Sequence, residues 1–217
     1  MDGVTEMRTG KFITVEGIEG VGKSSNIKVL VNAIEQAGYA VLTSREPGGT
    51  PMAERIRELL VEHGDEPMPD IAELLLMFSS RALLVNNVIR PALAAGTWVV
   101  CDRFADASRA YQGGGRGIPL EHINQVADWV LGDLQPDLTI LLDAPAETGM
   151  RRAVERAAPD RIEVERSDFF GRVRDCYLGL AQAEPERFVV IDASQDLDDV
   201  SAEVEAAVAQ LLSDNQD

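Results

Sequence analysis

The residues with the clearest chemical signature form a glycine-rich segment near the start of the chain. Residues 17–24 read Gly-Ile-Glu-Gly-Val-Gly-Lys-Ser, which matches the spacing G-x-x-x-x-G-K-S. Glycines allow backbone N–H groups to turn inward around a phosphate, the lysine reaches the terminal phosphates, and the hydroxyl can ligate Mg²⁺. An ordinary glycine turn is the alternative, but this segment follows a predicted strand and opens a predicted helix, which favours nucleotide binding. The predicted nucleotide-binding residues are Gly17, Ile18, Glu19, Gly20, Val21, Gly22, Lys23, Ser24 and Ser25.

Charged side chains follow two further predicted strands. Asp102 and Arg103 come directly after the apolar segment 98–101, and Arg45 opens the sequence Arg-Glu-Pro-Gly-Gly-Thr after the segment 40–44. Because the carboxyl ends of parallel strands face a shared ligand crevice, we expect these groups to lie near the phosphate loop. The alternatives are a surface ion pair for the first and a plain Pro-Gly turn for the second.

Two later segments are also unusual in composition. Residues 110–117 read Ala-Tyr-Gln-Gly-Gly-Gly-Arg-Gly. So many glycines lose much backbone entropy on folding, and we expect a flexible loop there rather than a packed element. Seven of the 17 arginines lie within residues 151–174, interleaved with acidic side chains. A salt-bridged helix surface would explain them, but guanidinium groups close to an anionic ligand would also serve phosphoryl transfer.

The elements that must position these residues alternate along the chain. Predicted strands cover residues 12–16, 40–44, 98–101, 138–143 and 188–192. Predicted helices cover residues 24–37, 52–63, 71–94, 120–131, 168–183 and 200–212. Short apolar strands separated by helices indicate right-handed crossovers and a parallel sheet covered on both faces.

Length and composition narrow the classes of protein. A chain of 217 residues predicts one domain, over 11–212, with a flexible arm at 1–10 and a flexible tail at 213–217. A net charge of −17 argues against a nucleic-acid polymer as partner. We find no apolar run of about 18 to 20 residues and no secretory signal, so we expect no membrane partner and a cytoplasmic location. Cys101 and Cys176 are interpreted as small buried hydrophobes.

Taken in order, the motifs resemble the bacterial type of the thymidylate kinase (dTMP kinase) family. They are the phosphate loop, Arg-Glu-Pro-Gly-Gly-Thr, Asp-Arg-Phe, Ala-Tyr-Gln-Gly-Gly-Gly-Arg-Gly and Asp-Arg-Ile-Glu, within about residues 11–192. The resemblance implies the α/β, three-layer P-loop NTPase fold of nucleoside monophosphate kinases. This fold has a five-stranded parallel sheet flanked by helices and a lid segment, here at about 149–163. It also implies a homodimer that uses Mg²⁺ to transfer the γ-phosphate of ATP to dTMP, giving dTDP and ADP for dTTP biosynthesis.

The resemblance also implies roles for residues that follow the strands. Lys23 and Ser24 would hold the ATP phosphates and Mg²⁺, and Glu19 would lie near the 3′-hydroxyl of the acceptor sugar. Asp102 would orient Arg103 or a metal-bound water. Acceptor-binding residues on other segments would be Arg45 and Arg103 at the phosphate, and Tyr111 and Gln112 at the deoxyribose and base.

The same resemblance bears on the lid and the base pocket. Because the phosphate loop carries no arginine, the lid is expected to supply one, with Arg156 as the first choice and Arg152 as the second. Arg81 would hydrogen-bond the thymine, with Ser108 nearby. A family phenylalanine usually stacks on the base four residues before this arginine, where the present chain has Met77. Phe78 lies three residues before it, and on a helix either side chain could cover the ring.

Two other functions stay open on sequence grounds. A P-loop deoxynucleoside kinase or another pyrimidine nucleotide kinase is the nearest alternative; the former would need a carboxylate base for a neutral hydroxyl. A non-enzymatic nucleotide-dependent switch is less favoured, because no guanine-selecting Asn-Lys-x-Asp element occurs.

Overall fold

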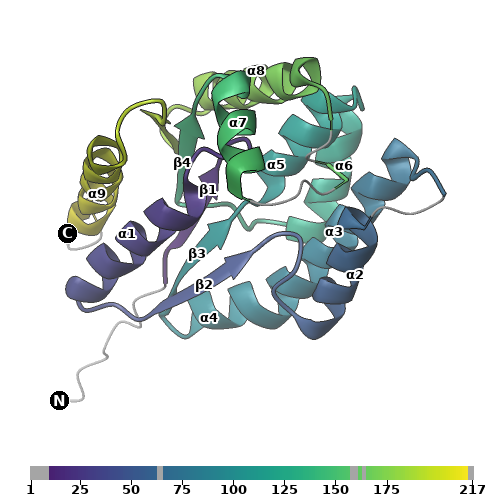
Figure 1. Ribbon diagram of the computed structural model, residues 1–217. Helices are drawn as coiled ribbons and strands as arrows, with labels where there is room; N and C mark the ends of the chain where they lie inside the picture. The colour runs from purple at the N-terminus through teal and green to yellow at the C-terminus, as the bar shows by residue number, and fades with distance from the viewer. Residues whose placement is uncertain (1–9, 63–65, 157–160, 163–164, 215–217) are drawn as a thin grey trace.

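A central parallel sheet organises the molecule (Figure 1). The computed structural model describes residues 10–62, 66–156, 161–162 and 165–214. Within this part, five strands form one sheet in the order β2-β3-β1-β4-β5. Their bounds are Phe12–Glu16 (β1), Val41–Arg45 (β2), Trp98–Asp102 (β3), Leu138–Asp143 (β4) and Phe188–Asp192 (β5). The predicted α/β class and five-stranded parallel sheet are confirmed.

The first strand occupies the point where the winding of the sheet reverses. β1 pairs in parallel with β3, where Ile13 lies opposite Val100, and with β4, where Ile13 lies opposite Leu138. The chain leaves β1 for the β2–β3 side and later crosses to β4 on the other side. All five β1 residues are buried. In open α/β sheets, ligands bind beyond the carboxyl ends of strands at such a reversal, so the segment after Glu16 is in the expected place.

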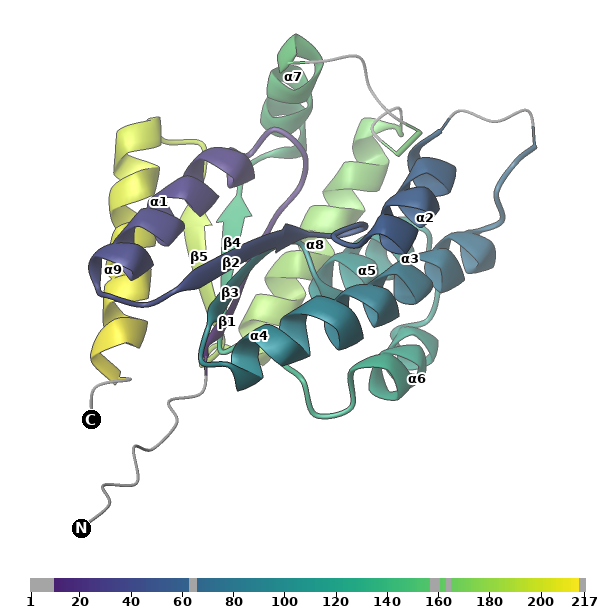
Figure 2. The same cartoon turned by 90° about the horizontal axis from the view of Figure 1, so that it is seen from below.

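Helices cover both faces of the sheet and shield it from water. Ile13 packs with helix residues Leu30 and Ile34 in one hydrophobic cluster. Its neighbour Phe12 points the other way, into a second cluster with Phe78. In both views α1 and α9 lie side by side, away from α3 and α6 (Figures 1 and 2). The helix bounds are Lys23–Gln36 (α1), Pro51–Val61 (α2), Asp70–Leu84 (α3), Arg90–Ala94 (α4), Ala105–Ser108 (α5), Leu120–Leu131 (α6), Ala146–Arg156 (α7), Ser167–Ala183 (α8) and Leu197–Asp214 (α9), with π-helical turns at Val85–Ile89 (η1) and Arg109–Gly115 (η2).

The expectation of a flexible loop at 110–117 is wrong. Most of that segment is the π-helical turn η2, packed against α8. A Cβ added at Gly114 would lie 2.6 Å from the Cβ of Cys176 and 2.8 Å from the carbonyl oxygen of Arg172. One added at Gly115 would lie 2.4 Å from the ring of Phe169. Close packing therefore explains Gly114 and Gly115, where no side chain fits. Gly117 has open space around it and a φ of 81° instead.

The expectation that no apolar run is long enough to cross a membrane also needs a correction, at the helical segment after residue 70. Asp70–Ala94 spans 25 residues, and a stretch of 18 of them has a mean hydropathy of 1.3, enough by length and composition to cross a bilayer. It is a helix of the protein core, since Leu74, Leu84 and Ile89 are fully buried in a hydrophobic cluster. It also carries the buried cation Arg81, which is ion-paired inside the protein.

Several predictions about the chain ends and cysteines have mixed outcomes. The predicted arm at 1–10 lies outside the described residues apart from Gly10, and the predicted tail at 213–217 does so apart from its first two residues. Cys101 is buried as expected. Cys176 is half-buried, and its thiol donates a hydrogen bond of 3.3 Å to the carbonyl oxygen of Arg109.

Candidate active site

The phosphate loop links the end of β1 to the start of α1. Gly17 has a φ of 131°, and a Cβ there would lie 2.4 Å from the carbonyl oxygen of Leu142. Gly22, at the helix N-cap, has a φ of 88°. Both values lie in the left-handed region that glycine tolerates best, so the loop conformation depends on these two residues.

Three predicted nucleotide-binding residues turn away from the cavity beside this loop. Ile18 and Val21 are 3% and 2% exposed and belong to the hydrophobic core, where they anchor the loop to the sheet. Gly17 packs against β4. The side chains of Ile18 and Val21 therefore make no contact with a ligand in the cavity, and these three residues could bind a phosphate only through their backbone N–H groups.

Lys23 folds back over the loop. Its Nζ donates hydrogen bonds of 3.1 Å to the carbonyl oxygen of Gly17 and 2.8 Å to that of Ile18. Burial, together with the nearby Arg103 cation, lowers the pKa of Lys23 to about 8. The ammonium therefore stays mostly protonated at neutral pH, and a neighbouring anion would stabilise its charged form.

Arg103 joins the end of β3 to the phosphate loop. Its Nη1 donates to the carbonyl oxygen of Gly17 at 2.9 Å, and its Nη2 to Glu19 Oε1 at 2.8 Å. Its φ is 69°, the one positive φ of a non-glycine residue among those that the structure describes. Such a conformation is strained and needs support from its surroundings. Tyr111 provides some, because the Arg103 guanidinium carbon lies 4.8 Å from the centre of that ring.

The tyrosine also contacts the loop directly. Tyr111 donates its hydroxyl hydrogen to the Glu19 carboxylate, with distances of 2.9 and 2.8 Å to the two oxygens. The same carboxylate forms an ion pair with the Arg103 guanidinium. This cluster places a charged group of each sign and an aromatic ring at one wall of a cavity.

A cavity of about 390 Å³ extends from the phosphate loop to the residues after β2 and β3. This size fits a small-molecule site. Most predicted site residues line it: Glu19, Gly20, Gly22, Lys23, Ser24, Ser25, Arg45, Met77, Arg81, Asp102, Arg103, Ser108, Tyr111, Gln112 and Arg152. Arg156 ends α7, but its side chain lies outside the described part of the chain.

Arg81 is buried at the floor of the cavity. Its Nε donates to Glu46 Oε2 at 2.8 Å, its Nη1 to the Ser108 hydroxyl at 3.0 Å, and its Nη2 to the carbonyl oxygen of Phe104 at 2.9 Å. Phe78 lies on its core side, with the guanidinium carbon 4.4 Å from the ring centre. These contacts hold one planar cation in a single orientation.

Phe78, one of the two side chains predicted to cover the base, lies on the core side of α3. Its side chain is 2% exposed, belongs to the hydrophobic core and does not line the cavity. Met77, one position earlier on α3, does line it. The helix therefore turns the methionine toward the cavity and the phenylalanine toward the sheet.

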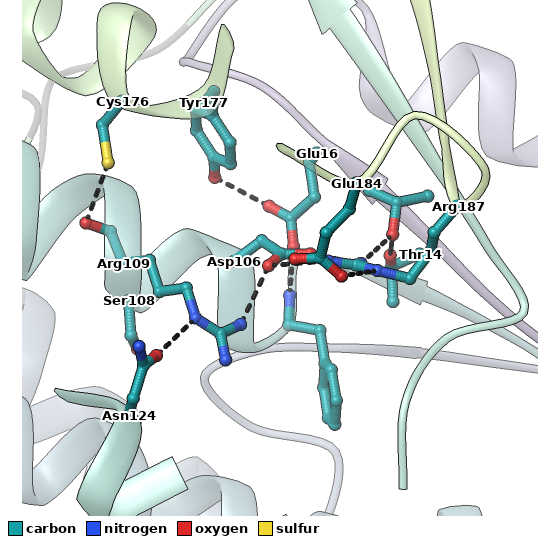
Figure 3. Close-up of polar contacts among 12 residues, drawn as sticks. Thr14, Glu16, Asp106, Ser108, Arg109, Asn124, Cys176, Tyr177, Glu184 and Arg187 are labelled. Carbon is teal, nitrogen blue, oxygen red and sulfur yellow. Dashed lines mark hydrogen bonds and ion pairs between the residues drawn. The ribbon is translucent and has the colours of Figure 1, made fainter. Parts of the chain in front are cut away.

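Sequence reasoning missed three buried glutamates. Glu16 accepts hydrogen bonds of 2.7 Å each from the backbone N–H of Phe104 and the hydroxyl of Tyr177 (Figure 3). Burial, with a smaller contribution from Asp106, raises the pKa of Glu16 to about 7. Glu46 lines the cavity. It directly follows Arg45 in the sequence, and this position could have identified it as a site residue. The third, Glu73 on α3, lies in no motif.

The donors at the loop fit a magnesium ion held together with a nucleotide. Ser24 and Asp102 both line the cavity, one at the start of α1 and the other at the end of β3. Mg²⁺ commonly takes one or two protein oxygens and completes its shell with phosphates and water. No group of three or more metal-binding side chains occurs in the described residues. A site of that kind is not required for a phosphate-bound Mg²⁺.

The comparisons with known proteins agree with this geometry. The family model described as thymidylate kinase matches residues 15–204. The chain is 51% identical to a thymidylate kinase of Ectopseudomonas mendocina, over 94% of this chain and 97% of that protein. It is 52% identical to one of Methylococcus capsulatus, over 95% and 98%.

This chain belongs to the thymidylate kinase family. The kinase also resembles the crystal structure of the Ehrlichia chaffeensis thymidylate kinase, with a TM-score of 0.74 and 32% identity over 93% of this chain and 99% of that one. The family resemblance, the phosphotransferase activity and the fold of the predictions are confirmed. The alternatives of a deoxynucleoside kinase and a nucleotide-dependent switch are not favoured.

Proposed function

We propose that this kinase transfers the γ-phosphate of ATP to dTMP and releases dTDP and ADP. The observation that carries the proposal is the single cavity lined both by the phosphate loop and by the polar groups around Arg81. The end at the phosphate loop suits the phosphates of a nucleoside triphosphate, and the end at Arg81 suits a planar base. A monophosphate is already ionised near neutral pH, so the reaction needs alignment and charge neutralisation rather than a general base.

The phosphates of both reactants meet at the loop. Lys23 would bind the terminal phosphates of ATP, and Ser24 and Asp102 would hold Mg²⁺. When bound, that ion neutralises charge on the transferred phosphoryl group. Arg103 and Arg45 would bind the acceptor phosphate. Arg45 now pairs with Glu54 at 2.7 Å on the surface, an exposed contact that an anion could replace at low cost.

A segment of about 149–163 would act as a lid over the donor. Arg152 on α7 lines the cavity and donates a hydrogen bond of 2.8 Å to the carbonyl oxygen of Ala193. This placement makes it a candidate to neutralise the transferred phosphate. Arg156 remains the other candidate, and comparing kcat of the two alanine variants distinguishes them.

The acceptor nucleoside would lie between Tyr111 and Arg81. The Tyr111 ring restricts the space beside the sugar, and Glu19 would accept a hydrogen bond from the 3′-hydroxyl. At the base, Arg81 and Ser108 supply donors on one side and Met77 covers the ring. These residues line one cavity.

We also infer a homodimer in the cytoplasm. Exposed apolar side chains gather on the paired helices α2 and α3: Met52 and Leu59 on the first are 58% and 57% exposed, and Ile71 and Leu75 on the second 55% and 51%. Such a stripe on two adjacent helices is typical of an interface. The described cysteines are free thiols, which suits a reducing compartment. Sedimentation of Leu75→Glu should show monomers if the stripe is the interface.

An acceptor panel tests the activity. The enzyme is supplied with ATP and Mg²⁺ and with dTMP, thymidine, dUMP, dCMP or no acceptor, and ADP release is followed. The proposal predicts turnover that depends on the acceptor and is fastest with dTMP. Preference for thymidine, or ATP consumption without an acceptor, would contradict it.

A further inference from the structure

A buried carboxylate outside every sequence motif lies behind the proposed base pocket. Glu73, on α3, is 1% exposed. Its Oε1 accepts hydrogen bonds from Gln112 Nε2 at 2.9 Å and Arg116 Nε at 3.3 Å, and its Oε2 from Arg116 Nη2 at 3.1 Å and Arg161 Nη2 at 2.7 Å. Burial raises the pKa of Glu73, but these hydrogen bonds outweigh that effect and lower it. The group is therefore a carboxylate at neutral pH and only accepts hydrogen bonds.

This contact decides which way the amide of Gln112 faces. An amide can present either its oxygen or its NH₂ group to a neighbour, but an ionised carboxylate can bond only the NH₂ group. The Gln112 oxygen must then face the other way. That residue is 1% exposed and lines the cavity. Its Oε1 has no hydrogen-bond partner among the described residues.

A buried acceptor without a partner is costly, so it points to a ligand group that donates. At neutral pH, dTMP has two hydrogen-bond donors, the 3′-hydroxyl and the imide N–H of the base. Glu19, which accepts a hydrogen bond from the Tyr111 hydroxyl, is the proposed partner of the 3′-hydroxyl. The imide N–H is left for the oxygen of Gln112.

We propose that Glu73 is a positioning residue that sets the base specificity of the acceptor pocket by holding the Gln112 amide oxygen toward the imide N–H. A cytosine base presents a lone pair at that ring nitrogen, which would face the fixed oxygen. The inference rests on the proposed acceptor, dTMP, and adds a physical source for the choice between pyrimidines. It predicts discrimination that depends on a residue which does not line the cavity.

Glu73 also pairs with arginines from other segments of the chain, so its replacement could have a purely structural effect. A control variant is therefore needed. The Arg161 guanidinium that it binds also donates from Nε to the carbonyl oxygen of Leu60 at 2.8 Å. Arg116 has a second ion pair, with Glu165. Glu165→Gln loosens this neighbouring pair without touching Gln112, and it is the matched control for a purely structural effect.

The test measures the dissociation constants of dTMP and 5-methyl-dCMP by calorimetry with the full chain. The two ligands have almost the same shape and differ at ring positions 3 and 4. Glu73→Gln allows either orientation of the Gln112 amide, and Gln112→Leu removes the acceptor. In both variants the preference for dTMP should fall about tenfold relative to wild type, as expected for one hydrogen bond. In the double variant it should fall no further, and in Glu165→Gln it should not change.

Several results would overturn the inference. One is an unchanged preference in Glu73→Gln when Gln112→Leu lowers it. Another is an unchanged preference in both, which would assign the imide to Glu46, whose Oε1 is the other unpartnered buried acceptor in the described chain. Equal weakening of both ligands would also contradict a positioning role, and urea unfolding of each variant identifies loss of fold. Failure of wild type to phosphorylate dTMP would refute the proposed function instead.

Discussion

The guanidinium of Arg103 and the carboxylate of Glu19 are 2.8 Å apart, although 84 residues separate them in the sequence. This ion pair joins the residue after β3 to the loop after β1. The backbone N–H of Arg103 also donates to the carbonyl oxygen of Val15 at 3.0 Å. These contacts hold the side chain beside the phosphate loop in a backbone conformation that most residues avoid.

Replacing Arg103 by alanine should remove a cation from the centre of the reaction. By analogy with arginine residues that neutralise transferred phosphates, we expect kcat to fall on the order of 10³-fold. Arg103→Lys keeps the charge but not the two-pronged contact, so it should recover only part of the rate. Steady-state kinetics with dTMP and ATP measures both. A kcat within about threefold of wild type in the alanine variant would remove this residue from the proposed chemistry.

Met77 and Phe78 should respond in opposite ways to alanine substitution. Met77→Ala should raise KM for dTMP by roughly tenfold, because it uncovers the base, and leave stability nearly unchanged. Phe78→Ala should lower the free energy of unfolding by about 3 to 5 kcal/mol, because the ring is buried beside Arg81. Kinetics and urea unfolding distinguish the two effects. A large change in KM in a fully folded Phe78→Ala protein would assign base stacking to Phe78 instead of Met77.

Gly114→Ala should destabilise the kinase by about 1 to 3 kcal/mol through overpacking. The added methyl group would meet backbone of Arg172 at 2.8 Å, which cannot move aside easily. Gly171→Ala on α8 is the matched control, since nothing lies within 4 Å of its added carbon. That change should stabilise the helix by roughly 0.5 to 1 kcal/mol. Equal effects in thermal or urea unfolding would show that packing does not explain the glycine run.

Glu16 should make stability depend on pH. Its pKa is raised from 4.5 to about 7 in the folded state, so folding favours the protonated form. The associated stability is present below about pH 4.5, is lost as the pH rises to about 7, and stays lost above that value. The difference between the two pKa values corresponds to about 3 kcal/mol.

Glu16→Gln removes this titration while offering similar hydrogen-bonding atoms to Phe104 and Tyr177. The variant should therefore be more stable than wild type at pH 8, by up to about 3 kcal/mol, and the gain should shrink toward pH 5. Urea unfolding of both proteins at pH 5, 6, 7 and 8 gives the difference directly. A gain of the same size at every pH would mean that Glu16 does not titrate in this range.

The sequence predicted those features that depend on neighbouring residues. The phosphate loop is one contiguous segment whose glycines, lysine and serine act together, so its motif indicated both its position and its chemistry. Alternating apolar segments predicted the strands, and strand ends predicted where Asp102 and Arg103 would lie. Helix boundaries differed by a few residues, because ends are set by local capping and packing together.

Other features depended on distant contacts. Gly114 and Gly115 read as part of a flexible loop, and only the approach of Cys176 and Phe169 on α8 showed that they are packed. The helical spacing of Met77 and Phe78 allowed either one to face the ligand. The orientation of α3 against the sheet decided between them, because one turn of a helix presents adjacent residues to different surroundings.

The amino-acid order by itself determined the fold class, the family and the phosphate-binding chemistry, since these follow from periodicity and from a short continuous motif. The tertiary structure alone decided that Glu73 lies behind Gln112 and that Phe78 belongs to the core. Those relationships join segments far apart in the chain, and no local pattern records them. The physical reason is that burial and hydrogen-bond pairing depend on which side chains folding brings together, and not on their separation in sequence.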